Sequence, residues 1–242
     1  MTIRGRLAVA IPYLATFAWA FAAFVAAQIA ALAALLWYRH GDLGAILTAP
    51  YDGAIVTLSV LVLNPVAVAV LLLAVQFRGA DPVEYLALVP PRLGTATIGA
   101  IGIIVIIAAT DALLFVSGRA IVSSFQVVSY TTAAAEGWLP LMWIATVIVA
   151  PAGEEIMFRG YLFRGWVHSQ RGAWIGVPLI SLLWMGLHVQ YDWTGMAEIL
   201  AAGLFLGWMR WRSGSTLLTF LLHALFNLEG MFETMAQVKH LF

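Results

Sequence analysis

Three charged residues stand close together in an apolar stretch, and their spacing suggests acid–base chemistry. Glu154, Glu155 and Arg159 fall within six residues of an otherwise apolar segment that begins near Trp138. An ionised side chain in hydrocarbon costs at least ~2.5–3.5 kcal/mol, so it is rare there unless it is paired or functional. Glu155 and Arg159 are four residues apart, so they share a helix face and can form an ion pair. Glu154 points ~100° away around the helix. The pattern predicts one structural carboxylate and one that is available for catalysis.

Three polar residues in later apolar segments can reach the depth of Glu154. Glu154 lies seventeen residues before Arg171, and His188 lies seventeen residues after it. In a helical hairpin that turns near Arg171, these two side chains therefore lie at the same depth. His223 is ten residues beyond the next turn, which places it roughly 15 Å into the membrane at 1.5 Å per residue, as Glu154 is. Asn227 shares a helix face with His223. The spacing predicts that four polar side chains converge near mid-membrane.

This set of side chains suits the attack of water on an amide or ester carbonyl. A carboxyl group in an apolar site can act as a general base near neutral pH. A histidine beside it can orient the water or share the proton, and a second histidine and an asparagine can donate hydrogen bonds to a developing oxyanion. Other systems are absent from the sequence: it has no Cys, no G-x-S-x-G and no H-E-x-x-H.

Three short motifs occur in order along the chain. They are Glu-Glu-x-x-x-Arg, aromatic-x-x-x-His and His-x-x-x-Asn, at Glu154–Arg159, Trp184–His188 and His223–Asn227. Together they resemble the motifs of the CAAX prenyl endopeptidase type II and bacteriocin-processing (CPBP, or Abi) intramembrane proteases. The resemblance covers residues 138–232, and the earlier spans match only by hydropathy. One departure is Trp184, where the family usually has Phe; we expect an altered pocket shape with the chemistry retained.

The resemblance implies an intramembrane endopeptidase that uses a glutamate-activated water and no obligate metal. Its substrates are then membrane-associated proteins or peptides, such as prenylated CAAX-type proteins. It also implies a role for each motif residue: Glu154 activates water with His188, His223 and Asn227 stabilise the oxyanion, and Glu155 and Arg159 give support.

Two other functions remain open on the residues alone. Glu154, His188 and His223 could supply a His₂Glu zinc set, which would make the protein a metalloprotease. A transporter or membrane scaffold could also use a buried polar cluster, for ion passage or for partner binding. Transporters often contain paired repeats with broken helices, and we find no repeat in this sequence.

The elements that must position these residues are transmembrane helices. The chain of 242 residues is 63% hydrophobic and 10% charged, with a mean hydropathy of +0.95, whereas soluble domains carry about 25% charged residues. We expect a single all-α membrane domain over residues 1–242, with its motifs within 138–232 and about seven spans (six to eight). The expected spans are Leu7–Tyr38, Ala54–Phe77, Gly94–Ser117, Trp138–His168, Ala173–Tyr191, Thr194–Trp211 and Ser215–Ala236.

The connections between these spans are also predictable. Residues 43–53 and 118–137 are expected to be loops, and residues 78–93 a polar connection with one short interfacial helix. Pro65 is expected to kink the second span, and Pro151 should bend the fourth span close to the glutamates.

The basic residues predict a cytoplasmic N-terminus in a cell (inner) membrane. With that orientation the inner segments hold Arg4, Arg6, Arg78, Arg92, Arg164, Arg171, Arg210 and Arg212, and the outer segments hold Arg39, Arg119 and Lys239. The net charge is zero, and no basic patch with interleaved aromatic residues indicates nucleic-acid binding. The expected partners are the lipid bilayer and a protein or peptide substrate.

Overall fold

The computed structural model describes residues 3–240, with side chains described from residue 12 onward, and this part of the chain contains helices and no β-strand. The elements, including two π-helical segments η1 and η2, are α1 (Ile3–Tyr38), α2 (Leu43–Thr48), α3 (Gly53–Phe77), α4 (Pro82–Tyr85), α5 (Leu93–Val116), α6 (Ser124–Ala135), α7 (Leu139–Ile144), η1 (Ala145–Val149), α8 (Ala150–Glu155), η2 (Ile156–Leu162), α9 (Phe163–Trp166), α10 (Gln170–Met185), α11 (Trp193–Ser213) and α12 (Thr216–Val238). The predicted all-α class is confirmed.

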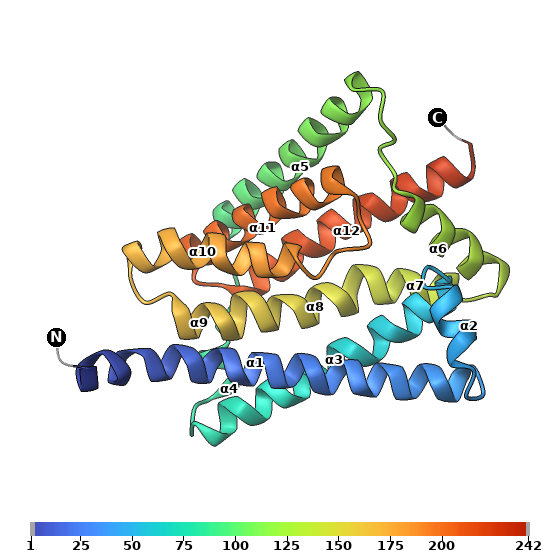
Figure 1. The fold of residues 1–242 in the computed structure, drawn as a ribbon. Helices are drawn as coiled ribbons and strands as arrows, with labels where there is room; N and C mark the ends of the chain where they lie inside the picture. Colours follow the sequence, from blue (N-terminus) through green and yellow to red (C-terminus); the bar gives the residue numbers. More distant parts are fainter. Residues whose placement is uncertain (1–2, 241–242) are drawn as a thin grey trace.

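The helices lie in layers around the segment from α7 to α9 (Figure 1). Helices α1 and α3 pack along each other on one side of this segment, and α10, α11 and α12 lie on the other side. Helix α5 packs outermost, against α11 and α12. Both α3 and α12 contact α8 directly. The short helix that carries Glu154 and Glu155 is therefore enclosed from two sides.

Small side chains allow the first two long helices to approach each other. Ala23 and Ala27 of α1 and Ala67 and Ala74 of α3 are buried in one core cluster. Small residues at a helix interface in a membrane let the backbones come close, so dispersion contacts between them increase. These two helices form a wall that supports α8.

The predicted fourth span is one continuous helical segment, but its hydrogen-bond register changes twice. The π-helical segments η1 and η2 flank the six residues of α8. The amide of Ala150 donates to the carbonyl of Ala145, five residues earlier, just before Pro151, which has no N–H to donate. Insertions of this kind often occur at functional sites. Next to Pro151 the structure thus shows a π-helical register on the N-terminal side, and the bend that we expected there stays a prediction.

His188 lies outside the helix in which we expected it. The predicted span Ala173–Tyr191 is too long, because α10 ends at Met185 with Gly186 as its C-cap. His188 then lies in a turn in which its amide donates to the carbonyl of Met185. The imidazole of His188 also bonds to the carbonyl of Trp184, which accepts the backbone amide of Leu187 as well. The side chain of His188 thus bonds to the last turn of α10, and the helix ends at Met185 although the sequence remains apolar beyond it.

Two connections that we expected to be loops contain helices. Residues 43–48 form α2, and residues 124–135 of the predicted loop 118–137 form α6. Helix α6 begins with a capping box: the backbone amide of Gln126 donates to the Ser123 hydroxyl, and the backbone amide of Ser123 donates to the Gln126 side chain. Its Ser and Thr content concealed it, and the hydroxyls of Thr131 and Thr132 bond to carbonyls within the helix itself. The short helix expected within residues 78–93 is present as α4.

Four described helical stretches are long and apolar enough to cross a membrane: Pro12–Tyr38, Gly53–Phe77, Leu93–Val116 and Leu139–Trp166. This identifies an integral membrane protein. The predicted number of about seven spans is not confirmed. Helix α10 has 16 residues, about 24 Å at 1.5 Å per residue, against about 30 Å of hydrocarbon. Helices α11 and α12 hold too many polar residues to qualify on hydropathy.

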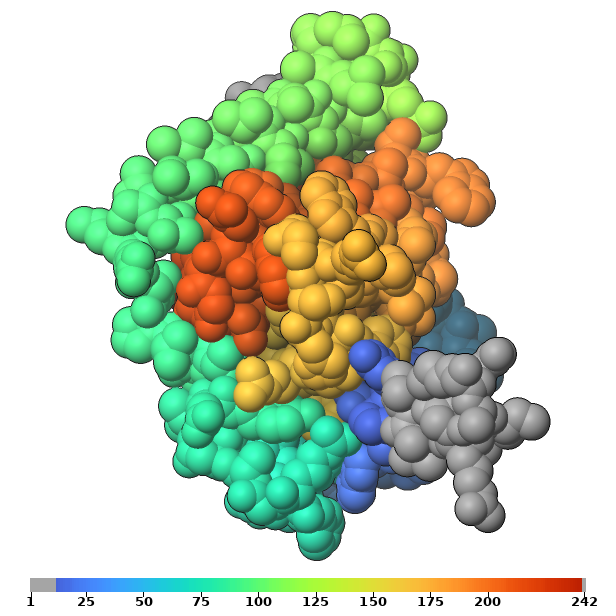
Figure 2. Space-filling view, turned by 90° about the vertical axis from the view of Figure 1, so that its left-hand side faces the viewer, coloured from blue at the N-terminus to red at the C-terminus, as the bar shows by residue number. Residues whose placement is uncertain are grey.

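One end of the molecule gathers three connections that we expected on the inner side. Figure 2 views this end, where the α3–α5 connection, the start of α10 and the α11–α12 turn lie around one another. They carry Arg78, Arg92, Arg171 and Arg212. The four residues thus lie at one end of the bundle, as the predicted orientation requires; the membrane side that this end faces stays a prediction.

Candidate active site

A cavity of about 470 Å³ brings together the four residues expected to act in catalysis. Glu154 enters its wall from α8, His188 from the turn after α10, and His223 and Asn227 from α12. Residue counting predicted that these four side chains converge, and the structure brings all four to one cavity. The shortening of α10 does not remove His188 from the cavity, because the turn after the helix still places its ring next to Glu154.

Glu154 is the carboxylate that faces the cavity. The indole Nε1–H of Trp184 donates a hydrogen bond of 2.5 Å to its Oε2. The Nε2 atom of His188 lies 4.0 Å from the same oxygen. The side chain of Glu154 is 24% exposed, and that of His188 is 17% exposed. This separation is too long for a direct hydrogen bond, but one water can contact both groups.

The hydrogen bond made by His188 determines its tautomer. Its Nδ1 lies 2.8 Å from the carbonyl oxygen of Trp184. Because a carbonyl oxygen only accepts, Nδ1 carries the hydrogen. In the neutral imidazole, Nε2 is then an acceptor that faces Glu154. The backbone of α10 thus orients the ring nitrogen that takes part in the site.

Glu155 belongs to a fully buried ionic network next to the cavity. Its Oε1 accepts from Nη1 of Arg159 at 2.8 Å, and both side chains are 0% exposed. Nη2 of Arg159 donates to the carbonyl of Gly203 on α11 at 3.1 Å. The predicted ion pair is therefore present, and it also links the α8–η2 segment to α11.

The same carboxylate oxygen also holds His223. Nδ1 of His223 lies 3.0 Å from Oε1 of Glu155. An ionised carboxylate only accepts, so Nδ1 of His223 carries a hydrogen. Its Nε2 can then donate to an oxyanion only when the ring is doubly protonated. The sequence did not reveal this contact between Glu155 and His223.

Asn227 is oriented by the π-helical segment η1. Its Nδ2 donates to the carbonyl of Thr146 at 2.8 Å. A primary amide has two N–H groups, so this bond leaves the second one free to act as a donor. The contact fixes the plane of the amide where it lines the cavity.

Trp184 is the residue whose role sequence reasoning missed. We expected it to change only the shape of the pocket, but it also bonds to Glu154. Its ring lies edge-on to His188 and to His223, with 5.1 Å between ring centroids in each pair. The guanidinium of Arg159 lies 4.5 Å from the ring centre. The sequence did contain a sign of this bond: Trp184 stands where the motif usually has Phe, and an indole has an N–H donor that a phenyl ring lacks.

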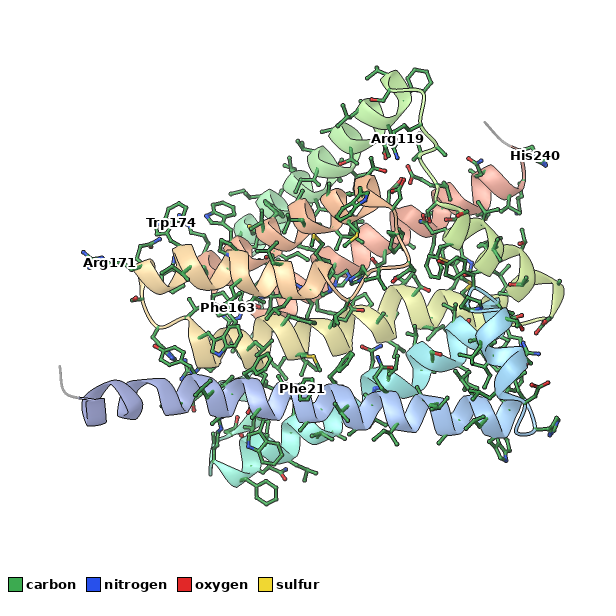
Figure 3. All side chains as sticks on the ribbon, in the orientation of Figure 1. Phe21, Arg119, Phe163, Arg171, Trp174 and His240 are labelled. Atoms are coloured by element: carbon green, nitrogen blue, oxygen red, sulfur yellow. The ribbon has the colours of Figure 1, made fainter. Side chains whose placement is uncertain are left out.

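Four acidic residues outside the motifs line the cavity further from Glu154: Asp111, Glu198, Glu229 and Glu233. At its rim, Arg119 of the α5–α6 connection pairs with Asp192 at 3.0 Å (Figure 3). Asp192 is also the N-cap of α11, and hydrogen bonds from the Gly195 amide and the Thr194 side chain lower its pKa to about 2. It is therefore ionised at any physiological pH.

The zinc set considered from the sequence is not assembled in this conformation. A metal site needs at least three ligand atoms close together. Within residues 12–240, one set of three acidic or histidine side chains has its ligand atoms within 4.8 Å of one another: Asp111, Glu229 and Glu233. Glu154, His188 and His223 do not form such a group, and Nδ1 of His223 is already bound to Glu155. An all-carboxylate group also lacks the nitrogen and sulfur ligands that zinc sites usually contain.

Comparison with known proteins agrees with the motifs. Residues 136–228 match the family model of the type II CAAX prenyl endopeptidase Rce1-like proteins. An uncharacterized 24.3 kDa protein of Escherichia coli is 37% identical over 87 residues, which are 34% of this chain and 39% of that protein. The chain thus matches about two fifths of the length of this curated relative. No solved structure matches the chain. The matched segment, residues 136–228, contains all three motifs and is similar to the Rce1-like family of type II CAAX prenyl endopeptidases, the family that the motifs resemble.

Proposed function

We propose that this protein is an intramembrane endopeptidase that hydrolyses a peptide bond with a water activated by Glu154. The observation that carries the proposal is the placement of Glu154 and His188 4.0 Å apart in a cavity that His223 and Asn227 also line. The family match over residues 136–228 supports a protease.

In this mechanism the water lies between Glu154 and His188 and gives its proton to the carboxylate as its oxygen attacks the peptide carbonyl. Nε2 of His188 accepts a second hydrogen bond from the same water, because its Nδ1 is held by the Trp184 carbonyl. The proton then passes from Glu154 to the leaving amine. The products are a carboxylic acid and an amine, which become a carboxylate and an ammonium group when the acid's proton passes to the amine, and the enzyme returns to its starting protonation state.

The oxyanion is stabilised from the α12 side of the cavity. The second amide hydrogen of Asn227 donates to it, and so does Nε2 of His223 when Glu155 stabilises the imidazolium. Donors fixed in advance in a site of low dielectric constant stabilise such a charge more than water does. Arg159 supports this side indirectly, because it fixes the carboxylate that fixes His223.

The proposed substrate is a segment of a membrane-associated protein or peptide, such as a prenylated CAAX-type protein. The hydrophobic segment or prenyl group of such a substrate would bring the scissile bond to the depth of Glu154. The cavity would supply the polar groups that the reaction requires.

The proposal is tested by purifying the protein in detergent and comparing wild type with Glu154→Gln on a panel of membrane peptides with and without a prenyl group. Gln keeps the size of the side chain but cannot accept the proton. We expect cleavage by wild type and none by folded Glu154→Gln. Equal cleavage by the two proteins would refute the mechanism. A transporter would instead give solute flux in liposomes and leave every peptide intact.

A further inference from the structure

We propose that Trp184 is a positioning residue: its indole N–H holds the Glu154 carboxylate in its ionised form, with the oxygen Oε1 free to take a proton from water. This inference rests on the proposed function of Glu154. It assigns to Trp184 a polar role that is separate from the packing of its ring.

The indole is fixed so firmly that its N–H has one available direction. Trp184 is 1% exposed. The Arg159 guanidinium covers its face, and His188 and His223 lie against it in edge-on geometry. Gly203 of α11 lies so near that a Cβ there would be 3.0 Å from Cε3 of the indole. The ring therefore has no space in which to turn its N–H away from Glu154.

That N–H meets one oxygen of the cavity-facing carboxylate and leaves the other free. The donor reaches Oε2 of Glu154. Among the residues that the structure describes, Oε1 of Glu154 receives no hydrogen bond. A donor to the charged form of a carboxylate favours that form over the protonated one. The arrangement thus favours the ionised form of the carboxylate and leaves Oε1 as the oxygen without a protein donor.

Phenylalanine at this position would separate the two roles of Trp184. Its ring can keep the contacts with Arg159 and both histidines, but it has no N–H donor. Trp184→Phe therefore removes the hydrogen bond and keeps most of the apolar packing. The charged and titratable groups around Glu154 stay in place in this variant; they are Glu155 and Arg159 on its own segment, His188 and Tyr191 after α10, Glu198 on α11, and His223 on α12.

The first test is the pH dependence of kcat/KM for wild type, Trp184→Phe and the control Trp174→Phe. Trp174 is near the start of the same helix (Figure 3), is 75% exposed and is not among the residues that line the cavity. We expect the acid limb of Trp184→Phe to move to higher pH by about one unit. Activity at the acid side then falls about tenfold and recovers as the pH rises. The control should follow wild type. A Trp184→Phe profile that overlays wild type, or one that is lowered equally at every pH, would overturn the proposal.

The second test does not depend on turnover or on the folding of the Phe variant. In protein labelled with ¹⁵N at its ten tryptophan indoles, we expect one indole resonance to shift with pH in wild type and to be insensitive to pH in Glu154→Gln. If no indole resonance responds to Glu154→Gln, the proposed hydrogen bond is wrong. A wild-type protein that cleaves no peptide would refute the proposed function, whereas the indole spectra would still decide whether Trp184 holds Glu154.

Discussion

Glu155 and His223 are joined by a 3.0 Å hydrogen bond from Nδ1 to Oε1, and this oxygen also accepts from Arg159. The two adjacent glutamates of the first motif therefore make different contacts: Glu154 faces the cavity beside His188, and Glu155 holds His223. In the proposed mechanism Glu154 activates the water, and Glu155 acts through His223 on the developing oxyanion. The ion pair that links η2 to α11 is thus also the group that holds Nδ1 of His223 in place.

The first prediction is that the two glutamates differ in their effect on stability. Glu155→Gln and Arg159→Met should each lower the melting temperature in detergent, because each leaves one buried charge without its partner, at a cost of roughly 3–5 kcal/mol. The double variant should recover part of this loss, since neither charge remains. Thermal melts of the four proteins measure this effect.

Glu154→Gln supplies the contrast for these melts. Its carboxylate faces the cavity and has no cationic partner within 3.5 Å, so its replacement should leave the melting temperature unchanged or higher while turnover is lost. An early melt of Glu154→Gln beside a normal melt of Glu155→Gln would mean that the two roles are reversed.

A second prediction concerns Asn227. Asn227→Ala removes the proposed oxyanion donor, so kcat should fall by roughly 10²–10³ with little change in KM. Steady-state kinetics on a cleaved peptide measure both constants. Gln237→Ala on the exposed side of the same helix is the matched control and should behave as wild type. An unchanged kcat with a raised KM would make Asn227 a substrate contact.

Metal removal gives the third prediction. Because a water without a metal can perform the attack between Glu154 and His188, we expect activity to persist after treatment with a strong chelator. Metal analysis of the treated protein checks that no metal remains. A chelated protein that is inactive and regains activity with one equivalent of zinc would establish the metalloprotease alternative. Repeating the titration with Asp111→Asn distinguishes a zinc bound at the motif residues from one bound at the outer carboxylates.

The fourth prediction tests the support of α8 by α3. A Cβ added to Gly153 would overlap the side-chain amide of Asn64. Gly153→Ala should therefore destabilise the protein by about 1–3 kcal/mol and displace Glu154, which follows it directly. Gly94→Ala is the matched control, because Gly94 is also helical and nothing lies within 4 Å of its added Cβ. This control should be stabilised by about 0.5–1 kcal/mol. Melting curves that rank the two variants in the reverse order would contradict this close packing.

The sequence by itself determined the helical membrane class of the protein and predicted four residues that the structure brings to one cavity. Long apolar runs require helices in hydrocarbon, because every backbone polar group must be satisfied within the segment. The spacing of Glu155 and Arg159 required one helix face, and the residue counts around Arg171 placed Glu154 and His188 at one depth. These are consequences of local geometry, so they can be read from spacing alone.

Only the tertiary structure decided how the side chains are divided between roles. Nothing in the spacing shows that Glu155 also holds His223, because that bond joins α8 to α12, 68 residues further along the chain. The indole of Trp184 on Glu154 and the Thr146 carbonyl on Asn227 are likewise contacts between distant segments. The rotation of a helix about its axis depends on the packing of its neighbours, which a residue count does not contain. The same reason explains the end of α10 at Met185, where the hydrogen bond of His188 to a helix carbonyl outweighs the apolar composition that continues beyond it.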